Sequence, residues 1–251
     1  MKNVLITGGS KRIGKSISKF LATKGYNICV HYNNSENESL KLVNNLRSFK
    51  IKCERIKFDL GDTTNLKNFY DKILEKFGEI HLLINNASVF EYDSLKTSSL
   101  ESLDKHLNVN FKAPFFLSKY FSKSLGKNQN GLIINIIDQR VNNITPYFTS
   151  YTISKSALWT LTRSLALSLA PNIRVNAIGP GPTIKSLRQN QKQFKDQINR
   201  TPLKVKVDLD HINSGIEFFI KSKSVTGQII MLDSGQNLGW ANTTSKKFID
   251  D

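Results

Sequence analysis

The sequence contains little cysteine and no long apolar run. Only two of its 251 residues are cysteines, Cys29 and Cys53, which is too few for a disulfide framework and favours a reducing compartment. No window reaches the ~18–20 apolar residues that a membrane-spanning helix needs. The opening segment MKNVLITGG enters a strand-like run without the charged region and cleavage site of a signal peptide. We therefore expect a soluble cytoplasmic protein without a membrane partner.

Negative charge is also scarce, because 36 Lys and Arg residues face 20 Asp and Glu residues and give a formal net charge of +16. A strongly basic chain can indicate a polyanionic partner such as nucleic acid. The basic residues are spread from Lys2 to Lys247 without a long block, whereas a nucleic-acid surface concentrates them. We interpret the charge as a solvated lysine-rich surface and expect no nucleic-acid partner. One group of cations is a candidate for attracting anionic substrates: Lys185, Arg188, Lys192, Lys195 and Arg200.

Short apolar runs alternate with longer amphipathic stretches along the chain, which is typical of a parallel sheet with crossover helices. Strands are predicted at 3–7, 27–32, 51–58, 80–84, 131–137, 173–178 and 227–232, and helices at 13–22, 35–48, 64–77 and 149–170, with two more within 99–124. The strands are continuously apolar, so helices should cover both faces of the sheet. The sequence thus predicts a single α/β domain over residues 1–240 with a doubly wound, seven-stranded, parallel Rossmann-type sheet.

Two segments fall outside this pattern. Residues 179–206 contain Pro180 and Pro182 and many Gln, Asn, Lys and Arg residues, which indicates a long irregular insertion. Such an insertion late in a compact α/β domain is often a lid over the ligand. Residues 241–251 are polar, and we expect them to form a frayed tail.

A glycine-rich turn, Thr7–Gly14, links the first predicted strand to the first predicted helix. Glycines there let the backbone approach a pyrophosphate, and the free N–H groups of a helix N-terminus attract anions. Glycine also serves the geometry of many strand-to-helix turns, so the position of this turn matters more than its composition. The turn predicts a dinucleotide site.

The end of the second predicted strand lacks an acidic residue. Folds that prefer NAD usually place Asp or Glu there to bind the ribose 2′-hydroxyl, whereas this chain has the run His31–Ser35 (HYNNS). Cations such as Lys11 and Arg12, together with small hydrogen-bonding side chains, would hold a 2′-phosphate instead. We therefore expect NADPH rather than NADH. The alternative is a neutral surface loop.

Tyr151 and Lys155 lie four residues apart at the start of a predicted helix, so both side chains should share one face. An ammonium group beside a phenol lowers the tyrosine pKa and makes it a better proton donor near neutral pH. Asp138 directly follows the fifth predicted strand and can point into the same crevice, although an Asp there can equally cap a helix or turn. A Tyr-x-x-x-Lys pair in isolation is usually solvated, and its place at a strand's carboxyl end gives this one its weight.

From Met1 to about Trp240 the chain resembles the short-chain dehydrogenase/reductase family. The matching motifs are the Thr7–Gly14 turn, Asp59-Leu60 after the third strand, Asn85-Asn86-Ala87, Asn110, the Tyr151/Lys155 pair and Pro180-Gly181. The resemblance implies that Tyr151 gives the substrate its proton, that Lys155 binds the nicotinamide ribose and that Asn110 belongs to a water-linked proton relay. It also implies that Asp59 touches adenine, that Asn85 and Ala87 line the cofactor cleft, and that the protein is a homotetramer.

Two departures from the common family pattern indicate a subfamily. Arg12 stands where a second glycine is usual, and Asp138 stands thirteen residues before Tyr151, where a catalytic serine is usual. Both changes resemble pteridine reductases and the bacterial dihydromonapterin/dihydrofolate reductases, as do the His31–Ser35 loop and the run Asn86–Phe90. In those enzymes a serine matching Ser88 contacts cofactor and pterin, and a phenylalanine matching Phe90 stacks on the pterin ring. The alternatives are an ordinary core position for Phe90 and a surface ion pair for Arg12.

Three hypotheses of function follow. The first is NADPH-dependent reduction of a dihydropterin or dihydrofolate to the tetrahydro form. The second is a carbonyl reductase of the same family that acts on a 3-oxoacyl thioester, a sugar or a small ketone. The third is a non-catalytic NADPH-binding scaffold, although a scaffold has no need of a proton relay.

The residue sets for the first hypothesis are as follows. The catalytic set is Asp138, Tyr151, Lys155 and Asn110, and the substrate site is Arg12, Ser88, Phe90, Asp138 and Tyr151. The cofactor set is Gly8, Lys11, Arg12, Ile13, Gly14, His31, Tyr32, Asn33, Asn34, Ser35, Asp59, Leu60, Asn85, Asn86, Ala87, Ser88, Tyr151, Lys155, Pro180 and Gly181. No metal site is predicted.

Overall fold

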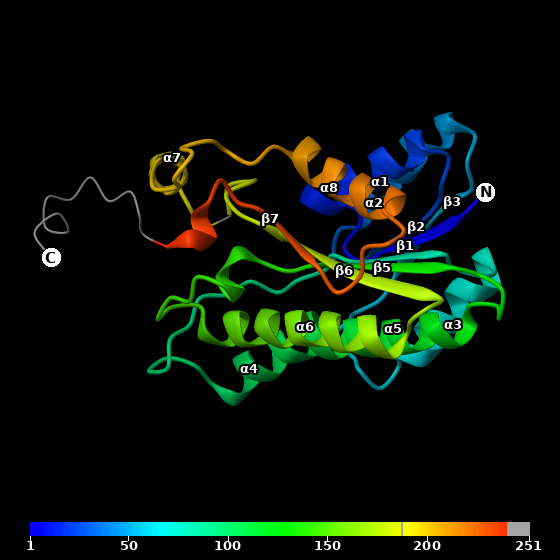
Figure 1. Cartoon of the computed structure of the whole chain (residues 1–251), viewed down its shortest axis with the longest axis horizontal. Helices are drawn as coiled ribbons and strands as arrows, with labels where there is room; N and C mark the ends of the chain where they lie inside the picture. The colour runs from blue at the N-terminus through cyan, green and yellow to red at the C-terminus, as the bar shows by residue number, and fades with distance from the viewer. Residues whose placement is uncertain (187, 240–251) are drawn as a thin grey trace, which may run out of the picture.

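The seven predicted strands form one parallel sheet. In the computed structural model, which describes residues 1–186 and 188–239, the strand order is β3-β2-β1-β4-β5-β6-β7 (Figure 1). The strands are β1 (Asn3–Ile6), β2 (Asn27–Tyr32), β3 (Cys53–Lys57), β4 (Leu82–Asn85), β5 (Gly131–Ile136), β6 (Ile173–Pro180) and β7 (Ile229–Leu232). Strand β1 pairs with β2 on one side and β4 on the other, so the chain changes direction across the sheet after β3. The predicted fold class is confirmed.

Helices cover both faces of this sheet (Figure 1). One face carries α1 (Arg12–Thr23), α2 (Glu36–Leu46) and α8 (Leu209–Lys221). The other face carries α3 (Leu66–Phe77), α5 (Ala113–Ser124) and α6 (Thr149–Ser168), and α4 (Leu100–Leu107) leads into α5 through a π-helical segment, Asn108–Lys112. Within the described ranges, no helix is both long and apolar enough to cross a membrane.

Two hydrophobic cores result from the alternation of side chains along each strand. Val4 and Ile6 pack under α1, α2 and α8, whereas Leu5 between them packs under α3 and α5, and all three are fully buried. Successive strand residues point to opposite faces, so a strand covered on both sides must be apolar at every position. This explains why apolar runs predicted the inner strands, whereas the edge strand β3 (CERIK) contains three charged residues.

The segment 179–206 is more regular than predicted. Strand β6 runs on to Pro180, and a nine-residue helix, α7 (Gln191–Asn199), forms within the expected irregular insertion. The helix has one buried residue, Phe194, so it lacks apolar periodicity. Its sequence signal is instead a capping box, in which Asn190 and Gln193 bond each other's backbone N–H groups.

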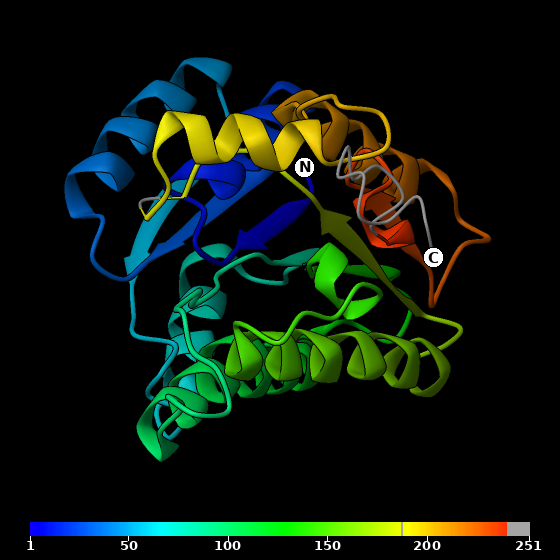
Figure 2. The same cartoon turned by 90° about the vertical axis from the view of Figure 1, so that its left-hand side faces the viewer.

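Helix α8 was also not predicted, although it buries Ile212, Ile216 and Phe219 at helical spacing. Helix α7 lies beyond the carboxyl ends of the strands, level with the layer that contains α1, α2 and α8 (Figure 1 and Figure 2). The predicted tail at 241–251 lies outside the described residues.

The two cores make a direct stability prediction. Replacing Leu5 by Ala leaves a cavity under α3 and α5, and we expect the free energy of unfolding to fall by about 2–5 kcal/mol. The matched control is Leu95→Ala, because Leu95 is 85% exposed and its truncation should cost less than about 0.5 kcal/mol. Urea unfolding measures both, and equal losses in the two variants would contradict the burial described above.

Candidate active site

The glycine-rich turn after β1 is held tightly against the turn after β4. Gly8 has φ +60°, and a Cβ there would lie 3.0 Å from the Cα of Ala87. A Cβ on Gly14 would clash with the Gly8 carbonyl oxygen. The Thr7 hydroxyl accepts from the N–H groups of Asn86 and Ala87 at 2.9 and 3.0 Å. Both glycines are therefore required where two backbone segments meet.

The N-terminus of α1 has no acidic residue in its first turn and no side-chain cap, so its N–H groups are available to an anion. Arg12 has φ +51°, a left-handed conformation that fits the glycine usual at this position. Its guanidinium donates to the carbonyls of Ile184 and Lys185 at 2.9 and 3.0 Å, which ties the turn to the 179–206 segment. The expected alternative of an ion pair is thus not what Arg12 forms.

Lys11, the other cation of the turn, forms an ion pair with Glu38 at 2.8 Å. Both side chains are about half exposed, and ion pairs of this kind contribute little stability. An arriving phosphate can therefore replace the carboxylate.

His31 does not face outward as the predicted cofactor loop requires. Its ring is buried, Nδ1 accepts from the Gly8 N–H at 3.0 Å, and Nε2 lies 3.0 Å from the carbonyl oxygen of Phe58. Burial lowers the pKa of His31 to about 4, so the ring is neutral near pH 7. Both ring nitrogens are engaged, so the imidazole cannot bind a 2′-phosphate. The expected direct contact of His31 with the cofactor is therefore wrong, because the side chain lies behind the glycine-rich turn.

The rest of the His31–Ser35 run divides in the same way. Tyr32 is buried and its hydroxyl accepts from Arg55 at 2.9 Å, whereas Asn33, Asn34 and Ser35 are at least partly exposed. The Ser35 hydroxyl lies 2.6 Å from that of Ser10 in the glycine-rich turn. The polar groups open to a ligand at this end are therefore the last three residues of the run.

The other predicted cofactor residues fall into buried and open groups. Asn85 is buried and donates to an asparagine on β5 at 2.8 Å, and Asn86 donates to the carbonyls of Thr7 and Gly8 at 2.9 and 3.1 Å. These two residues hold the turns in place. Asp59 and Ser88 are exposed, Ile13, Ala87 and Gly181 are partly buried, and Leu60 and Pro180 are buried.

Asp138, Tyr151 and Lys155 come together at the carboxyl end of β5. The Tyr151 hydroxyl donates to Oδ2 of Asp138 at 2.8 Å, and Oδ1 of Asp138 accepts from the Arg140 N–H at 2.9 Å. The Lys155 ammonium donates to the Ile136 carbonyl at 2.8 Å. Asp138 thus serves both of the roles left open by its sequence, since one oxygen caps a short helical turn and the other holds the tyrosine.

The expected direction of the Tyr151 pKa shift is wrong. Burial and the neighbouring Asp138 carboxylate raise the pKa of Tyr151 well above its ordinary value. Burial lowers the pKa of Lys155 to about 8, while the charge of Asp138 acts in the opposite direction. Burial also raises the pKa of Asp138. Tyr151 is therefore protonated at neutral pH and carries a proton that it can donate.

Asn110 lies in the π-helical segment and is fully buried. Its Oδ1 accepts from the Val89 N–H at 2.8 Å, and its amide donates to the Val89 carbonyl and the Ser154 hydroxyl, both at 2.9 Å. The side chain therefore positions Val89 and, with it, the flanking Ser88 and Phe90. Its role in a proton relay stays a prediction.

Phe90 is 39% exposed, so it is not a core residue. One face of Phe90 stacks on Phe148, with ring centroids 4.5 Å apart and an interplanar angle of 5°. The Phe90 and Tyr151 rings meet edge to face, with centroids 4.7 Å apart. The Arg140 guanidinium lies 4.8 Å from the centre of the Phe148 ring. The sequence did not predict Phe148 or Arg140 as site residues. The available signal was position alone, because Phe148 lies close to Tyr151 in the chain and Arg140 lies close to Asp138.

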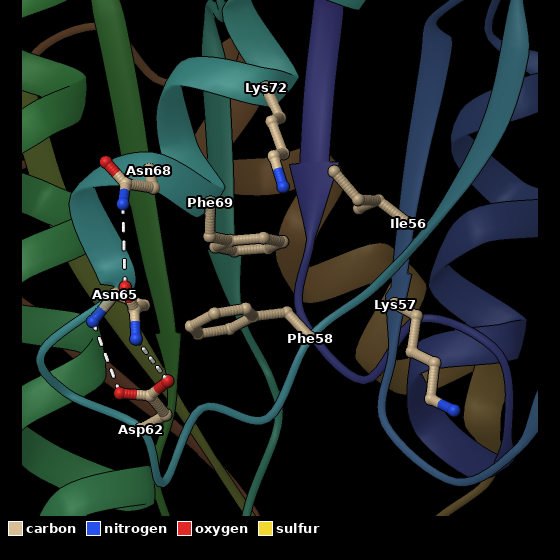
Figure 3. Close-up of a pocket in the computed structure, with 8 residues that line it drawn as sticks. All are labelled: Ile56, Lys57, Phe58, Asp62, Asn65, Asn68, Phe69 and Lys72. Atoms are coloured by element: carbon tan, nitrogen blue, oxygen red, sulfur yellow. Dashed lines mark hydrogen bonds between the residues drawn. The ribbon is translucent and has the colours of Figure 1, made fainter.

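A surface hollow lies beside β3 and the first turns of α3 (Figure 3). It is lined by Ile56, Lys57, Phe58, Asp62, Asn65, Asn68, Phe69 and Lys72, none of which was predicted as a site residue. Phe58 and Phe69 stack there with centroids 4.5 Å apart, and Asp62 accepts from Asn65. Within residues 1–186 and 188–239, no group of three or more His, Cys, Asp or Glu residues could hold a metal ion.

Comparison with known sequences places the chain among oxidoreductases. Residues 2–196 match the family model described as short chain dehydrogenase. An uncharacterized oxidoreductase of Thermotoga maritima is 32% identical over 246 residues, which cover 93% of this chain and 96% of that protein. L-rhamnose 1-dehydrogenase (NADP(+)) of Thermoplasma acidophilum is 29% identical over 201 residues, which cover 79% of this chain and 78% of that protein.

The fold agrees with a solved structure over nearly the whole chain. FolM alternative dihydrofolate reductase 1 from Brucella canis, crystallised with NADP, superposes with a TM-score of 0.93 at 39% sequence identity. The match covers 98% of this chain and 97% of that one. The family model, the Thermotoga relative and this structure together show that the chain belongs to the short-chain dehydrogenase family.

Proposed function

We propose that this protein reduces a C=N bond of a dihydropterin or dihydrofolate with NADPH. The observation that carries the proposal is the Tyr151–Asp138 hydrogen bond of 2.8 Å beside the partly exposed Phe90. A pterin needs a proton at a ring nitrogen and a flat surface for the ring, and these residues offer both. The solved Brucella structure, named a dihydrofolate reductase and crystallised with NADP, supports the same activity.

The turn residues fit a dinucleotide. Gly8 and Gly14 leave backbone where a side chain would intrude, and the uncapped N-terminus of α1 attracts a pyrophosphate. Lys11, Ser10 and Ser35 lie where a 2′-phosphate is expected. Bound NADPH supplies the hydride of the reaction.

Tyr151 and Asp138 handle the proton. Reduction of C=N adds a hydride to carbon and a proton to nitrogen, and Tyr151 is the protonated group at the end of β5. The phenolate left after proton transfer regains a proton through Asp138, whose raised pKa makes it a better proton carrier than an ordinary carboxylate. The Lys155 ammonium, whose Nζ lies 5.8 Å from the centre of the Tyr151 ring, stabilises the phenolate.

Phe90 provides the flat surface for the ring. Phe148 covers one of its faces, and Asn110 fixes the backbone beside it. Offset stacking of a heterocycle on a phenylalanine contributes roughly 0.5–1.5 kcal/mol. Arg12 stands at the same edge of the sheet as a permanent cation for the polar rim of the pterin.

Residues 179–206 act as the lid over this site in a reductase domain spanning residues 1–240. Helix α7 lies beyond the carboxyl ends of the strands on the side of α1 and α8 (Figure 2), and the hydrogen bonds of Arg12 join the segment to the cofactor turn. Its basic residues, including the exposed Arg188, are placed to attract the anionic tail of a folate. A homotetramer stays a prediction from the family resemblance, and a cytoplasmic location stays a prediction from the low cysteine content.

A carbonyl reductase is the second candidate. The L-rhamnose dehydrogenase of Thermoplasma acidophilum, whose name includes NADP(+), favours it. Carbonyl reduction gives no role to Asp138 or Phe90, however, because a sugar, a 3-oxoacyl thioester or a small aliphatic ketone has neither a ring nitrogen to protonate nor an aromatic face to stack.

The test of the proposal is NADPH oxidation with dihydrobiopterin, dihydromonapterin, dihydrofolate or a 3-oxoacyl thioester as substrate, together with NADP+ reduction by L-rhamnose. We expect turnover with one or more of the first three. Robust turnover of the thioester or of L-rhamnose without any turnover of a pterin or dihydrofolate would overturn the proposal in favour of the second candidate.

Asp138→Ser separates the two candidates at one residue. Serine can still cap the turn by accepting from the Arg140 N–H, but it cannot carry a carboxyl proton. We expect kcat for the best pterin substrate to fall about 10²-fold, within the range of general acid–base contributions. A kcat that is unchanged or higher in Asp138→Ser would point to the carbonyl reductase, which does not need a carboxyl group at this position.

The pH dependence of the reaction follows from Lys155. Its ammonium is present below a pKa of about 8 and lost above it, so kcat/KM should fall as the pH rises through about 8. Removing the Asp138 charge, which raises the Lys155 pKa, should move this alkaline limb to lower pH in Asp138→Ser. An alkaline limb of kcat/KM above pH 10 in the unmodified protein, or one that stays in place in Asp138→Ser, would contradict its assignment to Lys155.

Phe90→Ala removes the stacking surface and should raise KM for the pterin by about twofold to twelvefold, which corresponds to the roughly 0.5–1.5 kcal/mol of stacking. The KM for NADPH should change little. The control is Phe49→Ala, since Phe49 is 42% exposed and lies outside the proposed site. Steady-state kinetics with the pterin and NADPH both varied measure these KM values. An equal rise of the pterin KM in the two variants would contradict the proposal.

A further inference from the structure

His31 is a buried residue that the proposed reaction leaves unused. The residue is 2% exposed, and both ring nitrogens have a backbone partner: the Gly8 N–H on Nδ1 and the Phe58 carbonyl on Nε2, each at 3.0 Å. A ring that accepts at Nδ1 and donates at Nε2 is the neutral Nε2–H tautomer. The two contacts thus require one protonation state.

The first contact acts on the glycine-rich turn. Gly8 has φ +60° and no side chain of its own to hold it, so the acceptor of its N–H group fixes the orientation of that peptide. The backbone carbonyl of His31 also accepts from the Gly9 N–H at 3.0 Å. One residue on β2 therefore engages two successive amides of the turn and leaves the following ones free.

The second contact acts on the loop after β3. Phe58 directly precedes Asp59-Leu60, and its own N–H donates to the Tyr32 carbonyl at 3.0 Å. Phe69 meets the His31 ring edge-on at 5.4 Å and stacks on Phe58, whose ring it faces in Figure 3. The imidazole is therefore wedged between the turn and the loop by an aromatic pair.

We propose that His31 is a positioning residue for the dinucleotide, which joins the Gly8 turn and the Phe58–Asp59 loop into one rigid frame and so sets the affinity for NADPH without touching it. The inference rests on the proposed cofactor. It does not depend on which substrate is reduced.

Two substitutions separate the contacts. Asn places its Oδ1 as many bonds from Cα as Nδ1 of His31 and can accept from the Gly8 N–H. Gln places its Nε2 as many bonds from Cα as Nε2 of His31 and can donate to the Phe58 carbonyl, whereas its acceptor Oε1 lies one bond farther from Cα than Nδ1 and does not match the Gly8 N–H. His31→Asn therefore keeps the contact with the turn, and His31→Gln keeps the contact with the loop.

The measurement is the Kd for NADPH by fluorescence titration of the unmodified protein and both variants, with thermal unfolding and kcat recorded in parallel. We expect His31→Gln to raise Kd about tenfold, the value of one lost hydrogen bond, and His31→Asn to raise it less than about threefold. In both variants, we expect kcat at saturating NADPH to stay within about twofold of that of the unmodified protein. The opposite order of the two variants, or equal weakening in both, overturns the inference.

A second readout requires neither variant nor substrate. Nitrogen-15 NMR of the ligand-free protein should show His31 as the neutral Nε2–H tautomer with an unprotonated, hydrogen-bonded Nδ1. The Nδ1–H tautomer would overturn the inference even if a variant failed to fold. NADPH binding without pterin turnover would reject the proposed substrate and leave the role of His31 standing, whereas absence of NADPH binding by the unmodified protein would reject both.

Discussion

The site depends on one constraint of the sheet: β1 and β4 are neighbours, yet the segments that follow them lead to opposite faces. The chain after β1 enters α1, and the chain after β4 leads to α4 and α5 on the other side (Figure 1). Ligands of open α/β sheets bind where such connections diverge. The glycine-rich turn, the run Asn86–Phe90 and Asp138 all lie at this edge, although they are far apart in sequence.

The chemistry of the site comes from three ionisable groups in a buried place. An acid, a phenol and an amine without water cost stability unless each has a partner. Asp138 accepts from Tyr151 and from the Arg140 N–H, and Lys155 donates to Ile136. The same burial shifts the pKa values of all three, which is characteristic of groups retained for catalysis.

Much of the fold was predictable from the sequence, because a strand covered on both faces must be apolar throughout. Local spacing also predicted that Tyr151 and Lys155 share a helix face. The sign of the Tyr151 pKa shift was not predictable, since it depends on burial and on the Asp138 carboxylate that accepts from the Tyr151 hydroxyl. Nor could the sequence tell that His31 faces inward, because a residue at the end of a strand can point either way. Helix α7 escaped prediction because its signal is a cap rather than a periodic apolar face.

The central claim is that Phe90, Tyr151 and Asp138 form one site for a pterin. A crystal structure of the protein with NADPH and a dihydropterin tests it most directly. We predict that the pterin lies against the face of Phe90 that Phe148 leaves free, with a ring nitrogen within hydrogen-bonding distance of the Tyr151 hydroxyl. A pterin bound elsewhere, or a ring with no contact to Phe90 and Tyr151, would contradict the account.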